Sequence, residues 1–339
     1  MTAPEQTILA IVGNSGGTNV GECLRRAASA GGYRLIFFDS LEAYRGPRIT
    51  RSVAWHLLGR RPLHLDRFAT DVVEKCEQAR PGILIGTGTA PLTASALRAI
   101  RQCQVRCVNY STDDPWNPRM RAGWHLRALP EYDTVFTARR ANIGDLRALG
   151  CRDVRYLPFG YDETLCRPPE RSLDGARPEV LFVGGADPDR VEFMTEFMRL
   201  GPRVTLVGSY WERYGATCAF TLGQKPPEEV AALTAAAKVN LCLVRRANRD
   251  GHVMRSYEMA ATGACMLVED TEEHREIFGP DGEAVTYFRS PGDAAEQSWA
   301  LLADDFGRTQ FVQHARDRIC NANHTYRDRL SEMTQFRGT

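Results

Sequence analysis

The sequence predicts two α/β domains, each built around a parallel β-sheet and joined by a linker. The chain has 339 residues, which is enough for two domains. Short apolar runs rich in β-branched residues alternate with helical patterns along most of it, as in parallel sheets that are covered by helices. Residues 158–178 interrupt this alternation with four prolines and two glycines, and they show little apolar periodicity.

In the first half, six runs have the length and composition of buried strands. They are residues 7–12, 34–38, 82–85, 106–109, 134–137 and 154–157. Helical patterns lie between several of them, at residues 19–30, 67–78, 91–102 and 139–149. This order predicts one doubly wound domain over residues 1–160, followed by a linker over residues 161–178.

The second half repeats the pattern. Strands are expected at residues 180–183, 203–207, 239–244, 265–268 and 284–287, and helices at residues 189–200, 227–237, 254–261 and 293–304. We therefore expect a second doubly wound domain over residues 179–307 and a helical tail over residues 308–339 that packs back. Open α/β sheets bind ligands at the carboxyl ends of their strands, so two such Rossmann-like domains are expected to face a central ligand cleft.

Composition excludes several classes of protein. The 43 Lys and Arg side chains nearly cancel 42 Asp and Glu, which argues against a nucleic-acid-binding protein. No apolar stretch approaches the roughly 18 residues of a membrane span, and residues 1–6 lack the features of a signal peptide, so we expect a cytoplasmic protein. The ten cysteines form no C-x-x-C pair, and we interpret them as small buried apolar residues.

A glycine-rich turn, Gly13–Gly21, follows the first expected strand and opens a helix. The amides of Gly16 and Gly17, together with the helix N-terminus, could approach a phosphate. NAD binding is an alternative, because Asp39 ends the second strand where a dinucleotide site has an acid, but the glycine spacing is not G-x-G-x-x-G. A tight turn without a ligand explains the pattern equally well.

Residues 248–263 are the most informative segment. Asp250 lies in a loop after a buried strand, and Arg255 and Glu258 are three residues apart at the start of the next helix, hence on one face. A carboxylate can accept hydrogen bonds from both hydroxyls of a diol, and an arginine at a helix N-terminus can neutralise a diphosphate. These are the groups of a nucleotide sugar. The alternative is a surface ion pair between Arg255 and Glu258.

Asp250, seven intervening residues and Glu258, followed by small residues and Gly263, resemble the two-acid frame of glycosyltransferases with the GT-B fold. The surrounding sequence resembles the CgeB-like (spore maturation protein) branch of the group 1 glycosyl transferases, and the resemblance covers nearly the whole chain. The segments that carry it are Asn109–Pro115, Tyr132–Thr137, Tyr156–Asp162, Arg255–Glu258, Cys265–Phe278, Val285–Phe288 and His324–Arg329.

The resemblance implies roles for the acids of this frame. Glu258 would hold the ribose diol of the donor nucleotide. Asp250 would be a catalytic residue and, with the backbone of Gly251 and His252, would line the pocket of the donor sugar.

The resemblance also implies a diphosphate site after the first strand of the second domain. Related enzymes have an Arg and a Lys five positions apart there; in this chain Gly185 stands at the Arg position and Arg190 at the Lys position. One cation is therefore missing, and Arg255 is the candidate substitute. Gly16 and Gly17 would face the same phosphates from the first domain.

Four further acids are candidates for catalysis or metal binding. Asp113 and Asp114 follow a strand of the first domain, where an inverting transferase needs a general base. A retaining transferase needs no such base, and the two-acid frame is more usual among retaining enzymes. An Asp before a proline is also a common turn opener. Asp187-Pro-Asp189 is a D-x-D triplet, which binds a metal–nucleotide complex in another class of glycosyltransferases. We interpret it instead as a loop or helix N-cap, and expect no metal requirement.

An apparent insertion, residues 44–67, contains six arginines around an apolar stretch that includes Trp55. Residues 1–165 hold 22 basic and 16 acidic side chains, whereas residues 166–339 hold 21 and 26. The basic first domain therefore favours an anionic acceptor, or contact with lipid phosphates at a membrane surface. A solvated basic face is the simpler alternative.

Together these observations predict a glycosyltransferase of bacterial glycan biosynthesis. It would move a sugar from a nucleotide sugar, expected to be a UDP-sugar, to a glycan, lipid-linked, protein or small-molecule acceptor, with no cofactor besides the donor. A nucleotide-sugar epimerase of the same fold and a non-catalytic nucleotide-sugar or glycan-binding protein are the alternatives. No nucleic-acid partner is expected.

Overall fold

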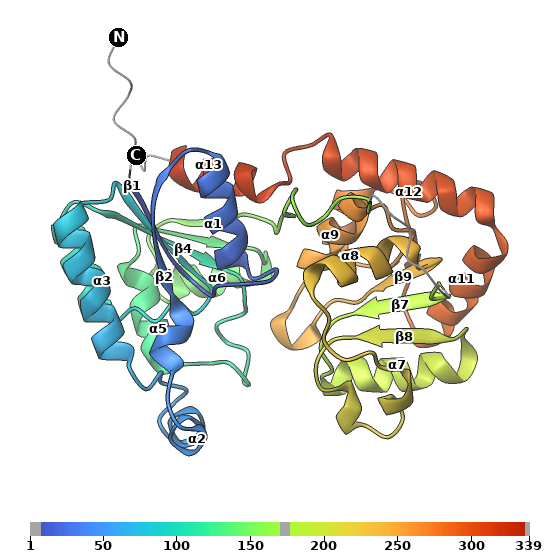
Figure 1. Cartoon of the computed structure of the whole chain (residues 1–339), viewed down its shortest axis with the longest axis horizontal. Helices are drawn as coiled ribbons and strands as arrows, with labels where there is room; N and C mark the ends of the chain where they lie inside the picture. The colour runs from blue at the N-terminus through green and yellow to red at the C-terminus, as the bar shows by residue number, and fades with distance from the viewer. Residues whose placement is uncertain (1–7, 170–176, 336–339) are drawn as a thin grey trace, which may run out of the picture. The chain divides into compact units, whose positions relative to one another are not determined.

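The computed structural model describes residues 8–169 and 177–335. Two compact units can be distinguished (Figure 1). Unit 1 comprises Met1–Phe159, Ala247–Arg249 and Tyr326–Thr339, and unit 2 comprises Gly160–Arg246 and Asp250–Thr325. Each unit contains one parallel sheet, which agrees with the predicted fold class.

The sheet of unit 1 has six parallel strands in the order β2-β1-β3-β4-β5-β6. They are β1 (Ile8–Gly13), β2 (Arg34–Asp39), β3 (Ile83–Thr87), β4 (Arg106–Ser111), β5 (Thr134–Thr137) and β6 (Val154–Tyr156). The four interior strands are almost completely buried, as expected for a sheet that is covered on both faces. All six were predicted; Thr7, the expected first residue of the first strand, lies outside the described residues.

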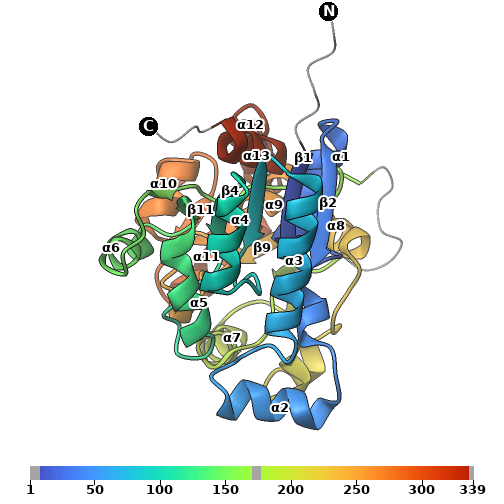
Figure 2. The same cartoon turned by 90° about the vertical axis from the view of Figure 1, so that its left-hand side faces the viewer.

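The helices of unit 1 are α1 (Val20–Ala30), α2 (Arg48–Leu57), α3 (Leu65–Ala79), α4 (Ala94–Gln102), α5 (Gly123–Ala128), α6 (Ala141–Ala148) and α13 (Tyr326–Gln335). On one face of the sheet, Ala10, Val12 and Leu84 pack against the apolar side chains of α3 and α4 (Figure 2). Helices α1 and α13 contact each other, and α1 also contacts β1 and β2.

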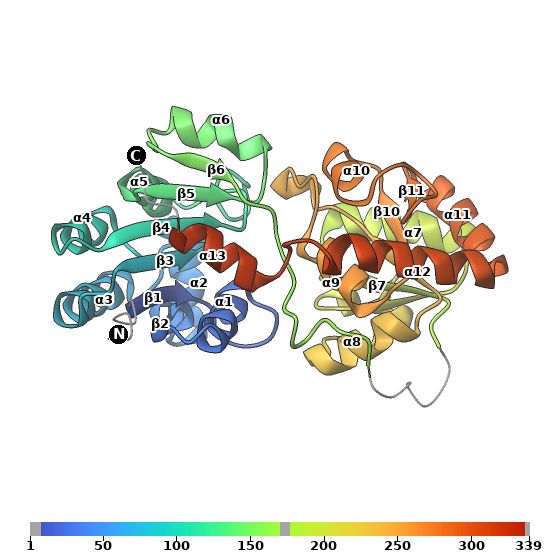
Figure 3. The same ribbon diagram turned by 90° about the horizontal axis from the view of Figure 1, so that it is seen from above.

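Unit 2 contains five parallel strands in the order β11-β10-β9-β7-β8. They are β7 (Val180–Val183), β8 (Val204–Val207), β9 (Val239–Cys242), β10 (Met266–Glu269) and β11 (Thr286–Phe288). Its helices are α7 (Pro188–Leu200), α8 (Pro227–Ala236), α9 (Met254–Thr262), α10 (Glu272–Phe278), α11 (Pro291–Ala303) and α12 (Asp305–Cys320). Helices α7 and α11 pack together against the core, whereas α9 contacts α8 and α12 (Figure 3).

The structure adds three helices and divides the tail. Helix α2 lies inside the predicted insertion, and α5 and α10 were not predicted. The predicted helical tail contains α12 and α13, which are separated at Asn321–Thr325. The Arg329 guanidinium of α13 donates hydrogen bonds to the carbonyls of Pro158 and Phe159, which secures this helix in unit 1.

Three further expectations from the sequence concern the linker, the cysteines and membrane-spanning helices. Part of the expected linker, residues 170–176, lies outside the described residues. Seven of the ten cysteines are buried, as expected, and Cys218 is exposed. Among the described helices, none is long and apolar enough to cross a membrane.

Candidate functional site

The carboxyl edge of the unit 2 sheet carries most of the predicted donor-site residues, because all its strands are parallel and end at this edge. Arg190 lies in the first turn of α7, directly after β7. Asp250, Gly251 and His252 lie in the loop between β9 and α9. Glu258 lies in the middle of α9.

Two arginines of this edge, Arg190 and Arg245, flank Asp187. Their Nε atoms lie 3.7 and 3.6 Å from Oδ2 of Asp187. These distances are too long for hydrogen bonds, and all three atoms are buried without a hydrogen-bond partner among the described residues. Burial and the charge of Arg245 lower the pKa of Arg190 to about 10, so Arg190 remains charged at neutral pH. Two guanidinium groups with unused N–H donors can bind a diphosphate.

The acids beside these arginines fix the local backbone. Asp187 is the N-cap of α7, where its Oδ1 accepts a hydrogen bond of 3.1 Å from the Arg190 N–H. The N-cap interpretation of the D-x-D triplet is therefore confirmed. Asp250 Oδ2 accepts the Arg245 N–H at 3.3 Å, and the Asp250 N–H donates to the Arg245 carbonyl at 3.3 Å. Asp250 thus closes the loop that follows β9.

Glu258 is 4% exposed, and the Arg255 guanidinium donates to its Oε2. The expected i,i+3 ion pair therefore forms, but it is not a surface pair, because the carboxylate is buried and only 27% of the Arg255 side chain is exposed. Burial raises the pKa of Glu258 and the charge of Asp162 adds to the rise, while Arg255 opposes it. Such a carboxylate retains acceptor capacity for ligand hydroxyls beyond its one arginine partner.

Helix α10 holds the loop that is predicted to line the sugar pocket. Gly251 passes so close to Glu273 that a Cβ at this position would lie 2.4 Å from the carboxyl carbon, so a larger residue would require the Glu273 side chain to move. The Thr271 hydroxyl donates to the Gly251 carbonyl at 2.5 Å. Nδ1 of His252, a fully buried ring, lies 2.5 Å from Glu273 Oε2. These contacts preorganise residues 251 and 252.

A second buried histidine connects α10 to the start of α9. His274 Nδ1 lies 2.8 Å from the Glu269 carbonyl, which can only accept, so Nδ1 donates. Nε2 then accepts from the Ser256 hydroxyl at 2.8 Å, and Ser256 Oγ accepts the Val253 N–H at 3.2 Å. Burial lowers the pKa of His274 to about 4, so the ring is neutral at pH 7. The network holds the first turn of α9, where Arg255 lies.

The glycine-rich turn of unit 1 is closed by its own carboxylates. Gly16 and Gly17 have positive φ values of 79° and 58°, a conformation that favours glycine. The Gly16 N–H points at Glu22 Oε2 at 3.3 Å. Asp39 accepts the N–H and the hydroxyl of Ser15, at 3.3 and 2.6 Å, and is thereby engaged within the turn. Phosphate binding by Gly16 and Gly17 stays a prediction.

The two acids that follow β4 differ in their surroundings. Asp114 is 2% exposed, and its carboxylate accepts hydrogen bonds from Arg249, Asn142 and the Trp116 N–H. Burial acts to raise the pKa of Asp114, but these donors outweigh it, and the pKa is lowered. Asp113 Oδ1 accepts one hydrogen bond of 3.2 Å, from Asn248. Asp114 is therefore saturated by donors, whereas Asp113 is not.

Replacing Asp114 by asparagine is expected to lower the free energy of unfolding of unit 1 by about 2 kcal/mol, because hydrogen bonds to a buried charge are lost. The lowered pKa adds a pH dependence: the stabilisation is present above about pH 4, the unfolded pKa of Asp, and disappears as the pH falls through the folded pKa. Urea unfolding at pH 7 and pH 3 measures both effects. Asp113→Asn is the control and should change stability much less; equal losses in the two variants would contradict the assignment.

Several residues of these sites were missed by the sequence analysis. Arg245 directly follows a predicted strand, at the carboxyl edge of the sheet. Because ligands bind at this edge, the position of Arg245 in the sequence could have indicated an anion-binding residue. Glu273 acts through His252, 21 residues away, and no spacing rule indicates that contact. Asn248 and Arg249 contact Asp113 and Asp114 across 135 residues of sequence.

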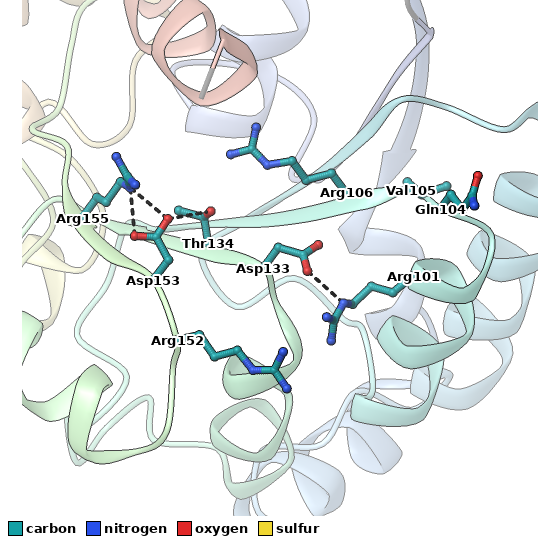
Figure 4. Close-up of a pocket in the computed structure, with 9 residues that line it drawn as sticks. All are labelled: Arg101, Gln104, Val105, Arg106, Asp133, Thr134, Arg152, Asp153 and Arg155. Atoms are coloured by element: carbon teal, nitrogen blue, oxygen red, sulfur yellow. Dashed lines mark hydrogen bonds and ion pairs between the residues drawn. The ribbon is translucent and has the colours of Figure 1, made fainter. Parts of the chain in front are cut away.

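Two cavities of unit 1 are lined by none of the predicted site residues. The larger, of about 720 Å³, lies at the amino ends of β4, β5 and β6 (Figure 4). The smaller, of about 300 Å³, lies beside α2. Within the ranges 8–169 and 177–335, no group of three or more His, Cys, Asp or Glu side chains is placed to hold a metal ion.

The C-terminal part of the chain is similar to a family of known proteins. A family described as glycosyl transferase-like matches residues 190–335, which is less than half of the chain but includes Arg190, Asp250 and Glu258. A search of curated protein sequences finds no match.

Solved structures extend the likeness to the whole chain. Sucrose-phosphate synthase from Thermosynechococcus elongatus superposes with a TM-score of 0.70 at 15% identity, over 98% of both chains. HepE (Alr3699) from Anabaena, in complex with UDP and glucose, gives 0.68 at 14% identity over 97% of this chain and 99% of that chain. A Listeria monocytogenes protein assigned as a UDP-N-acetylglucosamine 2-epimerase gives 0.58 at 10% identity, over 98% and 95%. The chain therefore has the two-domain GT-B fold of these enzymes, and its C-terminal part is similar to a glycosyl transferase-like family.

Proposed function

We propose that the chain is a glycosyltransferase that moves a sugar from a nucleotide sugar, specifically a UDP-sugar, to an acceptor. The observation that carries the proposal concerns the Nε donors of Arg190 and Arg245, which lie beside Asp187 at the carboxyl edge of unit 2. Both Nε atoms are buried and make no hydrogen bond to any described residue. Sugar transfer leaves a nucleoside diphosphate, and two cations fixed at its phosphates stabilise the charge that develops as the bond breaks. The family match over this region and the UDP complexes of HepE support the proposal.

Each donor-site residue then has a defined task. Glu258 accepts hydrogen bonds from the ribose diol, and Asp250, Gly251 and His252 line the sugar pocket. Arg245 supplies the second phosphate cation in preference to Arg255, because Arg255 is hydrogen-bonded to Glu258, whereas Arg245 Nε lies 3.6 Å from Asp187 without a hydrogen bond.

For an inverting transfer, Asp113 is a better general base than Asp114. A general base must have a free lone pair within reach of the acceptor hydroxyl. The Asp114 carboxylate is occupied by Arg249, Asn142 and the Trp116 amide, so Asp114 acts as a positioning residue for this loop. Membership of the CgeB-like branch, independence from metal ions and a role in bacterial glycan biosynthesis belong to the same proposal.

Thermal stabilisation by UDP-, GDP- and dTDP-sugars tests the donor. A ligand at about 100 times its Kd adds about 2.7 kcal/mol of stability, which is readily measured. We expect a UDP-sugar to stabilise the wild-type chain and Arg190→Gln to reduce this effect, with the exposed Arg199→Gln as control. Stabilisation by none of these donors would overturn the proposal.

Two other outcomes would identify the alternative functions. Products formed from the donor alone would identify an epimerase, which is the second candidate because of the likeness to the Listeria structure. Binding of the donor without any reaction would identify a binding protein.

The acceptor side of the proposal concerns α2, an amphipathic helix of unit 1. Ile49, Val53 and Leu57 follow one another at intervals of four residues, so they form one stripe, and they are 78%, 43% and 75% exposed. The next residue, Leu58, is 60% exposed. Contiguous exposed apolar side chains of this kind mark an interaction surface.

The charges around this stripe match an anionic membrane surface. Residues 43–65 contain five arginines and no acidic residue. Arg48 and Arg51 of α2 have no carboxylate partner among the described residues, and they line the 300 Å³ cavity together with Tyr44 and Trp55. An apolar stripe flanked by arginines is the pattern of a helix that lies in the lipid interface. We therefore place the acceptor at, or anchored in, an anionic phospholipid surface.

Vesicle sedimentation tests this placement. The wild-type chain should bind vesicles that contain phosphatidylglycerol, but not vesicles of phosphatidylcholine alone, and high salt should weaken the binding. The double variant Ile49→Gln/Leu57→Gln should bind at least about tenfold more weakly, since it loses most of the apolar insertion. Phe306→Gln, which changes a residue that is 73% exposed on α12, is the matched control. Binding that is insensitive to the α2 changes would refute the docking surface.

A further inference from the structure

The larger cavity of unit 1 is built from the amino ends of three neighbouring strands. Arg106 begins β4, Thr134 begins β5, and Arg152, Asp153 and Arg155 lie at the start of β6. The end of α4 and the residues after it complete the lining, with Arg101, Gln104 and Val105. The glycine-rich turn and Asp113 follow the opposite, carboxyl ends of strands in the same sheet. The cavity is therefore separate from the proposed catalytic residues of this unit.

The two acids in the cavity are already neutralised. Asp133 pairs with Arg101 at 2.9 Å and also accepts the Cys107 N–H at 2.8 Å. Asp153 pairs with Arg155 at 2.9 Å and accepts the Thr134 hydroxyl at 3.0 Å. Figure 4 shows these two pairs, with the four arginine side chains arranged around the two aspartates.

Arg106 and Arg152 are left without an ion-pair partner among the described residues, so the cavity carries two uncompensated positive charges. Arg106 Nη2 is buried and makes no hydrogen bond to any described residue. Burial lowers the pKa of Arg106, and Arg155 adds to this effect, although Asp133 and Asp153 oppose it. A buried N–H donor without a partner is unfavourable, and an anion in the cavity would satisfy it.

We propose that this cavity binds a small organic phosphate, with Arg106 and Arg152 holding the phosphate group. Guanidinium groups donate paired hydrogen bonds to phosphate oxygens, and two unpaired arginines match the charge of a phosphate monoester dianion. The volume of about 720 Å³ lies in the range of small-molecule sites, so it accommodates an organic group in addition to the phosphate. Because the site lies at the amino edge, its ligand is an effector rather than the donor or the acceptor.

Isothermal titration calorimetry with three probes tests the proposal: inorganic phosphate, glucose 6-phosphate and glucose. We expect phosphate to bind, glucose 6-phosphate to bind more tightly, and glucose not to bind. Arg106→Gln and the surface variant Arg152→Gln should each weaken glucose 6-phosphate binding at least about tenfold. Arg147→Gln, an exposed arginine on α6, is the matched control and should bind as the wild type does.

Three outcomes would overturn the inference. They are no binding of either phosphate compound, equal binding of glucose, and wild-type affinity in Arg152→Gln. Repeating the titration with saturating UDP separates this site from the donor site, because the proposed effector should still bind. Loss of binding in the presence of UDP would assign the phosphate to the donor site and refute the cavity, while leaving the proposed transferase activity intact.

Discussion

Replacing Glu258 by glutamine is expected to weaken nucleotide binding by about 10- to 150-fold, with the fold retained. Glutamine preserves the volume of the side chain inside α9 but removes one acceptor oxygen and the negative charge. A diol needs two acceptors, and a hydrogen bond to a charged group contributes about 1.5 to 3 kcal/mol. Arg255 loses its partner in this variant, but its side chain is 27% exposed, so water can solvate it.

Calorimetry with UDP measures this effect, because UDP contains the ribose diol and the diphosphate and needs no knowledge of the sugar. Glu272→Gln is the matched control, since Glu272 is an exposed acid in the first turn of α10. Unchanged UDP affinity in Glu258→Gln would remove Glu258 from the donor site. If Arg190→Gln weakened UDP binding but Glu258→Gln did not, the proposed diphosphate contact would be supported and the proposed ribose contact would not.

The fold could be predicted in detail because its strands are local features of the sequence. Each of the eleven strands contains or overlaps a short apolar run, because most strand positions of a covered parallel sheet are buried. Helix α2 escaped prediction as a helix because arginines interrupt its apolar residues, and because its stripe faces outward instead of meeting a core. Helix α10 is only seven residues long, which gives too little periodicity to recognise.

The candidate site was only partly predictable. The spacing of Arg255 and Glu258 correctly indicated a shared helix face, but spacing contains no information about the burial of Glu258. Asp113 and Asp114 look equivalent in the sequence. Their difference arises from Arg249 and Asn248, which come from another part of the chain, and such long-range partners are determined by tertiary structure alone.

The near-neutral charge of the chain has a structural meaning. The basic excess of residues 1–165 is concentrated in two places that the structure makes distinct, the arginines on and beside α2 and the cavity around Arg106. The cavity lies at the amino edge of the unit 1 sheet, whereas α2 lies in the segment that connects the carboxyl end of β2 to α3. The proposed membrane surface and the proposed effector site therefore account for much of the basic character of this half.

In the His274→Gln variant, the free energy of unfolding of unit 2 is expected to depend less on pH. The part that is lost corresponds to the uptake of about one proton on unfolding. In the wild type, the pKa of His274 is about 4 in the folded state, against about 6.5 when unfolded. Above pH 6.5 both states are neutral and the stability is fully present. As the pH falls from 6.5 towards 4, the unfolded chain takes up a proton that the folded chain excludes, so about 3 kcal/mol of stability is lost.

Hydrogen–deuterium exchange of peptides from α9 and α10 at pH 7 and pH 4.5, corrected for the intrinsic exchange rates, measures this change within unit 2 alone. His125, whose pKa is also lowered to about 4 by burial, acts in unit 1 and serves as an internal comparison. His56→Gln, at an exposed position of α2, is the control variant.

Because the protonated ring of His274 cannot accept a hydrogen bond from the Ser256 hydroxyl, the first turn of α9 should loosen over the same pH range, and UDP affinity should fall with it. An unchanged pH dependence in His274→Gln would show that another group controls the acid sensitivity of the donor site.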